Sequence, residues 1–317
     1  MSRLFRQRWW PGLAALLGLY LFLAFAAPRF YDVANLRDLA LTNASILLIA
    51  SGMTLVIVVS QIDISVGSLF ALTSVALGLL AKTGVSVALL PLAALVIGSM
   101  LGAINGALIS FVRAPSIVVT LATMVSLREA LRWITGGAWV EGLPADFQWF
   151  GQGQGIGEAI IIGTTAVLFG ALWWGSQNLS AFREIYATGS DAEAARLAGI
   201  STRQVVFGVF VLIGALTGVA ALLNAVRFSD VPANSGINLE LQTIAAVVVG
   251  GTPITGGQGS FFGTLIGVLL LGSISPALTF LGINPYWSKA IQGAIILVTV
   301  FLDALASHRQ KRLAVAA

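Results

Sequence analysis

Apolar runs of about twenty residues recur along this chain, and they constrain its fold more than any other feature. A helix needs about 20 apolar residues to cross the hydrocarbon core of a bilayer. Charged residues make up only 9% of the sequence, against roughly 25% in soluble domains. Because so few charges cannot cover a water-facing surface, we predict an all-α polytopic membrane protein, with a single transmembrane domain over residues 1–317.

Ten apolar segments are candidate spans. Two of them are too short to span a bilayer alone, and these two border the breaks "QIDISVG" and "GGTPITGGQGS". We therefore expect about ten transmembrane helices, some of them interrupted. The candidates are Trp10–Ala27, Leu41–Ser60, Ser68–Ala81, Ser86–Phe111, Ile117–Ile134, Ile156–Trp174, Val205–Val226, Leu241–Gly251, Phe261–Leu281 and Tyr286–Leu302.

The basic residues favour a topology with both termini in the cytoplasm, because Lys and Arg concentrate in cytoplasmic loops. Reading the N-terminal run as a cleaved signal peptide is the alternative, and it would leave nine spans. We favour the uncleaved first span. In that arrangement ten of the 17 Lys and Arg are cytoplasmic: Arg3, Arg6, Arg8, Arg113, Arg183, Arg196, Arg203, Arg309, Lys311 and Arg312.

One polar stretch, "YATGSDAEAARLAGISTRQ", interrupts the apolar blocks. Ser190 and Glu193 have the spacing of a capping box, so they predict the start of a short helix of about eight residues. Gly199 suits the left-handed conformation that ends a helix. Leu197 and Ile200 would form an apolar knob on it. A helix this short is marginal in water, so it either packs into a groove of a cytoplasmic partner or simply connects two spans.

Several kinds of chemistry do not fit this sequence. It contains no Cys, and its single His, His308, lies in a basic tail, so a thiolate or histidine metal centre is not expected. No G-x-x-x-x-G-K-[S/T] motif provides a nucleotide site. Paired catalytic carboxylates and basic patches interleaved with aromatic residues are missing as well. We therefore expect no catalytic residue, no bound metal or cofactor and no nucleic-acid partner.

The two breaks hold the candidate pathway residues. In the first break, Asp63 and Ser65 precede Gly67 at the start of a new helix. Asp63 either shapes a pathway or ties two helices together, as intramembrane carboxylates often do. In the interpretation that we favour, Asp63 or Ser65 instead caps that helix. The similar layout of the two breaks hints at an internal duplication. Glycines of the second break expose backbone to a cavity, pack helices closely, or do both: Gly250, Gly251, Gly256, Gly257 and Gly259.

Charged residues also cluster at the outer end of the fifth candidate span. Glu129 and Arg132 lie three residues apart, so they share one face of a helix beside Arg128. The pair either forms an ion pair on that face or meets a partner protein, and the ion pair is the simpler interpretation.

Four sequence blocks, in order, resemble those of sugar-importing ABC permeases of the ribose/xylose/rhamnose type. They are "GMTLVIVVSQIDISVGSLFAL" (Gly52–Leu72), "IVVTLATM" (Ile117–Met124), "EAARLAGI" (Glu193–Ile200) and "IAAVVVGGTPITGGQGSFFGTLIGVLLLG" (Ile244–Gly272). Each block alone is weakly specific, whereas the four in order are strongly specific. Gln61 and Ala122 depart from the family pattern, which has Gly at both places.

The resemblance implies the membrane subunit of a bacterial inner-membrane ABC importer. A cytoplasmic ABC ATPase using ATP and Mg would power it, a periplasmic sugar-binding protein would deliver the sugar, and a second permease subunit, identical or related, would complete the pathway. Residues 189–200 would form the cytoplasmic coupling helix that docks on the ATPase. Within it, the contacts are assigned to Glu193, Ala194, Ala195, Arg196, Leu197 and Gly199.

The substrate is less defined than the class. The segment Trp133–Phe150 resembles rhamnose and autoinducer-2 permeases more than ribose permeases, so rhamnose, autoinducer-2 and a pentose such as ribose all stay open. An ion- or proton-coupled secondary transporter is the alternative. Such carriers place ionisable residues inside their spans, and Asp63 is the one clear candidate here. A membrane enzyme is disfavoured by the absence of catalytic groups.

Overall fold

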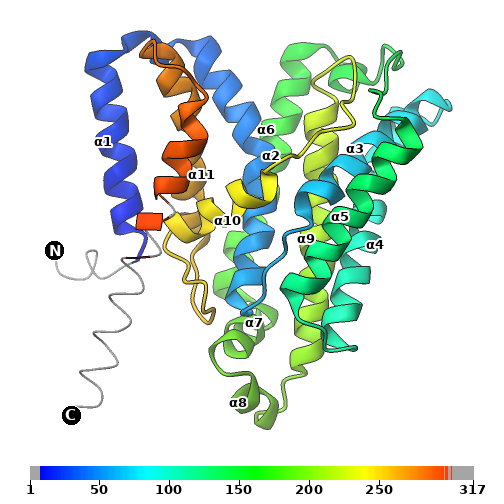
Figure 1. Cartoon of the computed structure of the whole chain (residues 1–317), viewed down its shortest axis with the longest axis vertical. Helices are drawn as coiled ribbons and strands as arrows, with labels where there is room; N and C mark the ends of the chain where they lie inside the picture. Colours follow the sequence, from blue (N-terminus) through cyan, green and yellow to red (C-terminus); the bar gives the residue numbers. More distant parts are fainter. Residues whose placement is uncertain (1–7, 296, 299–300, 302–317) are drawn as a thin grey trace.

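The computed structural model describes residues 8–295, 297, 298 and 301, and this part of the chain folds into helices (Figure 1). A single antiparallel bridge joins Val140 to Val231. Residues 287–295 are also helical. The named helices are α1 (Trp10–Ala26), η2 (Pro28–Tyr31), α2 (Val33–Val58), α3 (Val66–Lys82), η3 (Val87–Leu89), α4 (Leu90–Ser110), α5 (Ser116–Thr135), η4 (Gln148–Gly151), α6 (Gln154–Asn178), α7 (Ser180–Ser190), α8 (Ala192–Leu197), α9 (Thr202–Ala225), α10 (Leu239–Val249) and α11 (Phe261–Phe280).

Five of these segments are long and apolar enough to cross a membrane: α2, η3 with α4, α6, α9 and α11. The helices α1, α3 and α10 are apolar but shorter, and α3 and α10 are the two segments expected to be interrupted. The sequence therefore predicted a polytopic helical protein correctly, with helix ends within a few residues except at α2, which begins at Val33 instead of Leu41. The end of the tenth candidate span and the two basic tails, residues 1–7 and 302–317, lie outside the described residues.

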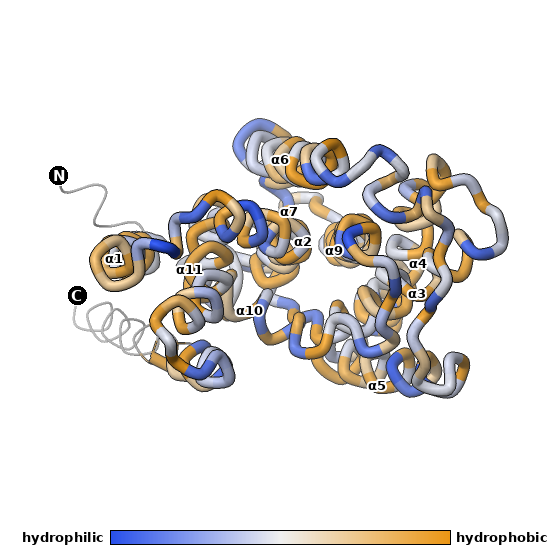
Figure 2. The backbone as a smooth tube through the Cα atoms, turned by 90° about the horizontal axis from the view of Figure 1, so that it is seen from above, coloured by the Kyte–Doolittle hydropathy of each residue, from blue (hydrophilic) through white to orange (hydrophobic). Residues whose placement is uncertain are grey.

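Helices α2 and α9 form the centre of the bundle, and the other helices surround them (Figure 2). α4 and α9 are the most closely packed pair. Their contact is a seam of glycines, because a Cβ on Gly98 or Gly102 would overlap the backbone of α9 near Gly214. Small residues allow such close approach between helices in lipid, where apolar burial supplies little driving force.

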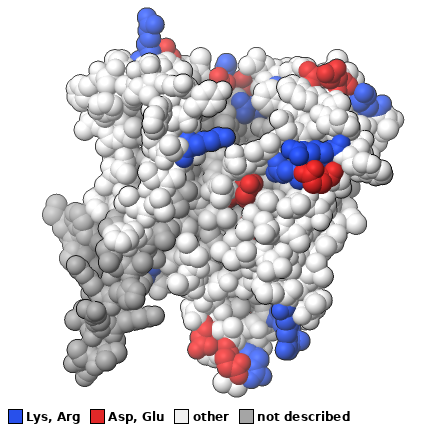
Figure 3. All heavy atoms as spheres, in the orientation of Figure 1, with Lys and Arg blue, Asp and Glu red and all other residues white. Residues whose placement is uncertain are grey.

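The outer faces of the surrounding helices are apolar. Met100 of α4, Val125 of α5 and Val167 of α6 are all largely exposed. On the face that Figure 3 shows, charged side chains gather in the upper part of the molecule and at its lower edge, and the surface between them carries almost no charge. This distribution is that of a protein whose middle lies in hydrocarbon.

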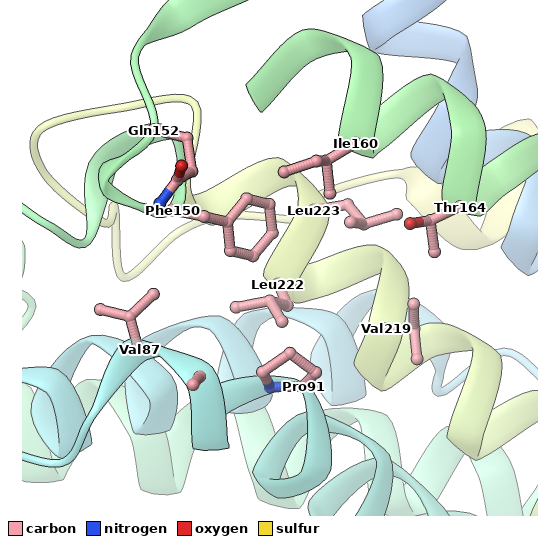
Figure 4. A pocket seen from close by; sticks show the side chains of 10 residues that line it. Val87, Pro91, Phe150, Gln152, Ile160, Thr164, Val219, Leu222 and Leu223 are labelled. Carbon is pink, nitrogen blue, oxygen red and sulfur yellow. The ribbon is translucent and has the colours of Figure 1, made fainter. Parts of the chain in front are cut away.

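A pocket of about 340 Å³ opens between α4, α6 and α9. Apolar side chains line most of it, including Pro91, Phe150, Ile160 and Leu222, while Gln152 lies at one side (Figure 4). Its lining suits apolar groups, and it is separate from the two breaks that the sequence singles out.

Candidate functional site

A polar hairpin of two helices, α7 and α8, projects from the lower end of the bundle (Figure 1). The sequence did not predict α7, which buries Phe182, Ile185 and Thr188. These residues are three apart, so the spacing of one helix face was the signal that could have revealed it. The short charged helix is α8, and it spans six residues instead of the expected eight.

The start of α8 corrects the predicted capping box. Asp191, not Ser190, is the N-cap residue, and its carboxylate accepts hydrogen bonds at 3.0 Å from the backbone amides of Glu193 and Ala194. Ser190 instead ends α7, and its hydroxyl donates to the carbonyl of Gly257 at 3.3 Å. Both Ser and Asp are good N-caps, so the extension of α7 up to Ser190 decides between them.

The outward face of α8 carries an ion pair and an apolar side chain. Glu193 does not reach back to the cap; Arg196 Nε donates to its carboxylate at 3.0 Å. This hydrogen bond lowers the pKa of Glu193 and raises the pKa of Arg196. Leu197 is 76% exposed, so its apolar side chain is accessible to a partner protein. Gly199 has φ +88°, which confirms the left-handed end.

Two further residues of the predicted coupling segment lie on α8 with different exposure. Ala195 is buried against the protein, whereas Ala194 faces outward with Glu193 and Leu197. A partner could therefore contact one face of α8, while the Ala195 face holds the helix on the bundle.

Ser60 joins the hairpin to both breaks. It follows α2, has φ +60°, and its hydroxyl lies 3.2 Å from the carbonyl of Gly189 and 3.0 Å from that of Thr255. Gly257 N donates to the carbonyl of Val58 at 2.8 Å. The end of α2, the end of α7 and the loop before α11 therefore meet at one point. Sequence reasoning missed this junction, because no local pattern shows contacts between segments so far apart.

Side-chain hydrogen bonds stabilise the first break. Asp63 is fully buried, and its Oδ1 accepts from the Ser65 amide at 2.8 Å and from the Ser65 hydroxyl at 2.6 Å. Asn105 Nδ2 donates to Ser65 Oγ at 2.8 Å, and Thr123 Oγ1 donates to Asn105 Oδ1 at 2.7 Å. Asp63 thus holds the turn just before α3 by accepting from Ser65, and does not cap the first amides of the helix as favoured. Ser65 is the N-cap residue, but its side chain makes no cap hydrogen bond and instead links α3 to α4.

The second break depends on backbone contacts. A Cβ on Gly250 would overlap the carbonyl of Gly263 in α11, so close packing, one of the two interpretations left open, is present there. Gly251 and Gly257 have φ +90° and +73°, values that side chains disfavour. At the start of α11, Ser260 Oγ accepts from the Gly263 amide at 3.2 Å.

Gly67 marks a further polar position, above the first break. A Cβ there would overlap the carboxylate of Glu240 and the carbonyl of Gly236, and would lie 3.3 Å from Arg128 Nη2. Arg128 also donates from Nε to Ser68 Oγ at 3.3 Å. Sequence reasoning did not single out Glu240, which begins α10 after a loop.

The neighbouring charges on α5 form the expected ion pair. Arg132 Nη1 lies 3.1 Å from Glu129 Oε1, and both side chains are more than half exposed. The pair is therefore separate from Arg128, which is half-buried.

Interrupted helices in a bundle with membrane-sized apolar helices, together with a polar hairpin joined to both interruptions, are an arrangement that many membrane transporters have. The comparisons with known proteins specify the class. The chain belongs to the family described as "Branched-chain amino acid transport system / permease component", which matches residues 35–300. Its members are permease subunits of ABC importers, as the four sequence blocks indicated.

Two relatives match over most of their length. The ribose import permease protein RbsC of Escherichia coli (strain K12) is 34% identical over 308 residues, which cover 95% of this chain and 96% of the relative. The autoinducer 2 import system permease protein LsrC of Escherichia coli (strain K12 / DH10B) is 34% identical over 286 residues, covering 89% and 84%. No solved structure matches the chain.

Proposed function

We propose that this protein is the membrane-spanning subunit of an ABC importer that carries a sugar into the bacterial cytoplasm. The match to the ribose import permease, which covers 95% of this chain and 96% of that protein, is the observation on which this rests. A polytopic bundle without a nucleotide-binding motif is consistent with a subunit that depends on a separate ATPase using ATP and Mg.

Ribose or a similar small sugar is the substrate we propose first. The ribose permease matches over more of its length than the autoinducer 2 permease, although the identity is equal. The segment Trp133–Phe150, by contrast, favours autoinducer-2 or rhamnose. These three compounds therefore form the substrate panel, and a periplasmic binding protein would deliver the substrate to the outer side.

The coupling role is assigned to α8. Glu193, Arg196 and Leu197 present a charged and an apolar contact on one exposed helix, and Ala194 and Gly199 allow close approach. The junction at Ser60 connects α7, and through α7 the adjoining α8, to both breaks. An ATPase that binds α8 differently in two states would shift the equilibrium between inward-open and outward-open forms. In this proposal α8 and both termini lie in the cytoplasm, and the chain pairs with a second permease subunit.

Transport by the reconstituted complex tests the proposal. The permease, its ATPase and its binding protein are placed in liposomes, and uptake of labelled ribose, autoinducer-2 and rhamnose is measured with and without ATP. We expect uptake of at least one compound that requires ATP, the ATPase and the binding protein. Uptake that persists without the ATPase and follows an imposed pH gradient would instead identify a proton-coupled carrier.

Substitutions in α8 test the coupling role. Leu197→Ala and Glu193→Gln are expected to lower uptake per ATP hydrolysed severalfold, because the ATPase loses contacts on the exposed face of α8. Leu179→Ala is the matched control, since Leu179 is an exposed leucine directly before α7 and therefore outside α8. Normal coupling in both α8 variants would contradict the assignment.

A further inference from the structure

Two charged side chains from different helices converge on the backbone of Gly67. Glu240 is the second residue of α10 and Arg128 lies on α5, while Gly67 is in the first turn of α3. A point one bond from the Gly67 Cα lies 3.3 Å from Arg128 Nη2 and still closer to Glu240 Oε2. The three residues are distant in sequence, so the fold alone brings them together.

Both charged groups have hydrogen-bonding capacity that the protein does not use. Glu240 is only 9% exposed, yet its Oε2 has no hydrogen-bond partner, and the buried Arg128 Nη2 has none either. Within the described residues, no ion pair joins the two side chains. An unpaired buried acceptor or donor costs about 1–3 kcal/mol, and more when it is charged. Such groups are retained when a ligand satisfies them in part of the functional cycle.

The missing side chain at Gly67 makes this arrangement possible. Any Cβ would displace the Glu240 carboxylate and the Gly236 carbonyl, because both pack against the backbone of α3. Ser68, the next residue, accepts from Arg128 Nε at 3.3 Å and so fixes the other charged group. Gly67 and Ser68 are therefore positioning residues for an acceptor and a donor.

Residues that neighbour the pair in sequence lie at the surface of the subunit. Val125, one turn before Arg128, is 51% exposed, and Leu241, next to Glu240, is 58% exposed. Charged groups beside an exposed apolar face are costly against lipid. This face is therefore better suited to the side on which the second permease subunit and an aqueous pathway lie.

We propose that Glu240 and Arg128 form a contact site for a neutral, polyhydroxylated substrate inside the pathway, an inference that rests on the proposed function. The carboxylate accepts and the guanidinium donates hydrogen bonds to hydroxyl groups, an arrangement that suits a sugar without requiring a charge on it. The pocket between α4, α6 and α9 has a mostly apolar lining, and no carboxylate or guanidinium group is among its lining residues.

Selectivity among hydroxyl groups provides the decisive measurement. Uptake of the transported sugar and of its single-deoxy analogues is measured in proteoliposomes with saturating, sugar-loaded binding protein. Glu240→Gln and Arg128→Lys are expected to reduce uptake about tenfold, as for one lost charged hydrogen bond. They are also expected to reduce discrimination against one deoxy analogue, a change that a purely structural role would not produce. Glu129→Gln and Arg132→Lys, which alter the exposed pair on the same helix, are the matched controls.

If the variants fail to assemble, a labelling experiment on the unmodified protein still tests the proposed site. An apolar carbodiimide labels accessible membrane carboxylates, and mass spectrometry follows the peptides that contain Glu240 and Glu129. The transported sugar is expected to slow labelling of Glu240 and leave labelling of Glu129 unchanged. Equal labelling with and without the sugar, or unchanged discrimination in variants that assemble, would overturn the site. A wild-type complex that takes up no sugar would overturn the proposed function itself.

Discussion

The two breaks in the bundle look alike in sequence but are stabilised in different ways. Residues 59–65, between α2 and α3, are fixed by buried side chains, chiefly Asp63, Ser65 and Asn105. Residues 250–260, between α10 and α11, are fixed by glycine backbone that packs against α11 at Gly263 and adopts positive φ values. Similar layouts therefore do not imply similar energetics: one break needs particular polar groups, whereas the other needs the absence of side chains.

Both breaks nevertheless meet the same hairpin. Ser60 lies at the start of the first break and contacts Thr255 of the second, while Gly189 of α7 packs against the carbonyl of Val58. A movement of the hairpin would therefore reach both breaks together. Substitutions within one break test how that break is stabilised, whereas substitutions at the junction between the breaks test coupling.

The largest effect is expected at Gly250. Gly250→Val places a branched side chain where even a Cβ overlaps Gly263, so it should destabilise the fold by about 3 kcal/mol or more. Thermal unfolding in detergent measures the loss. Gly170→Val on α6 is the control, since nothing lies within 4 Å of that position, and it should change stability by only about 0.5 kcal/mol. Equal effects at the two glycines would refute the backbone account of the second break.

Removing the Asp63 carboxylate from the first break should destabilise the fold somewhat less than Gly250→Val. Asp63→Ala leaves the buried Ser65 amide without its acceptor, for a loss of about 2–3 kcal/mol. Asp63→Asn keeps an acceptor oxygen and should lose about half as much. Ser260→Ala, the cap change in the second break, is expected to cost about 1 kcal/mol. The same unfolding assay ranks the three variants by their loss of stability. A larger loss for Ser260→Ala than for Asp63→Ala would contradict the conclusion that polar side chains matter more in the first break.

The junction between the breaks should affect coupling more than stability. Ser60→Ala removes hydrogen bonds to Gly189 and Thr255, for about 1 kcal/mol. Ser60→Gly removes them too but relieves the positive φ, so its stability should be close to wild type. Both variants should consume more ATP per sugar transported, measured in proteoliposomes. Full coupling in Ser60→Gly would show that the hydroxyl does not transmit movement.

The smallest effect concerns pH and involves neither break. Arg196 lowers the pKa of Glu193 below its ordinary value of 4.5. The contribution of this pair to stability is therefore fully present above about pH 4.5 and is lost as the pH falls through the lower, folded-state pKa. Wild type and Glu193→Gln, compared by thermal unfolding against pH, should differ slightly at neutral pH and converge in acid. A difference that grows in acid would contradict the pairing.

The sequence predicted the features that depend on local pattern. Apolar runs located the helices, Gly199 marked the end of α8, and the spacing of Glu129 and Arg132 predicted their ion pair. The cap of α8 was wrong because Ser190 and Asp191 are adjacent and equally able to cap. Contacts of α7 with Val58 and Gly257 decided between them, and a local pattern does not contain that information.

Contacts between distant segments could not be predicted. Ser60 looks like an ordinary polar residue after an apolar run, and only the fold places it against Gly189 and Thr255. Glu240 likewise resembles a favourable acidic residue at the start of a helix. Its convergence with Arg128 on Gly67 depends on how three helices pack, and single-sequence periodicity gives no measure of that.

The central position of α2 has a consequence for biosynthesis. From Leu41 onward this helix is largely enclosed by α6, α9, α10 and α11, yet the ribosome completes it before any of them. Its apolar surface lets lipid solvate it during that interval, and the later helices must then displace the lipid. We therefore expect a chain truncated after α6 to insert α2 stably but leave it accessible to lipid-soluble crosslinkers, which full-length protein would exclude.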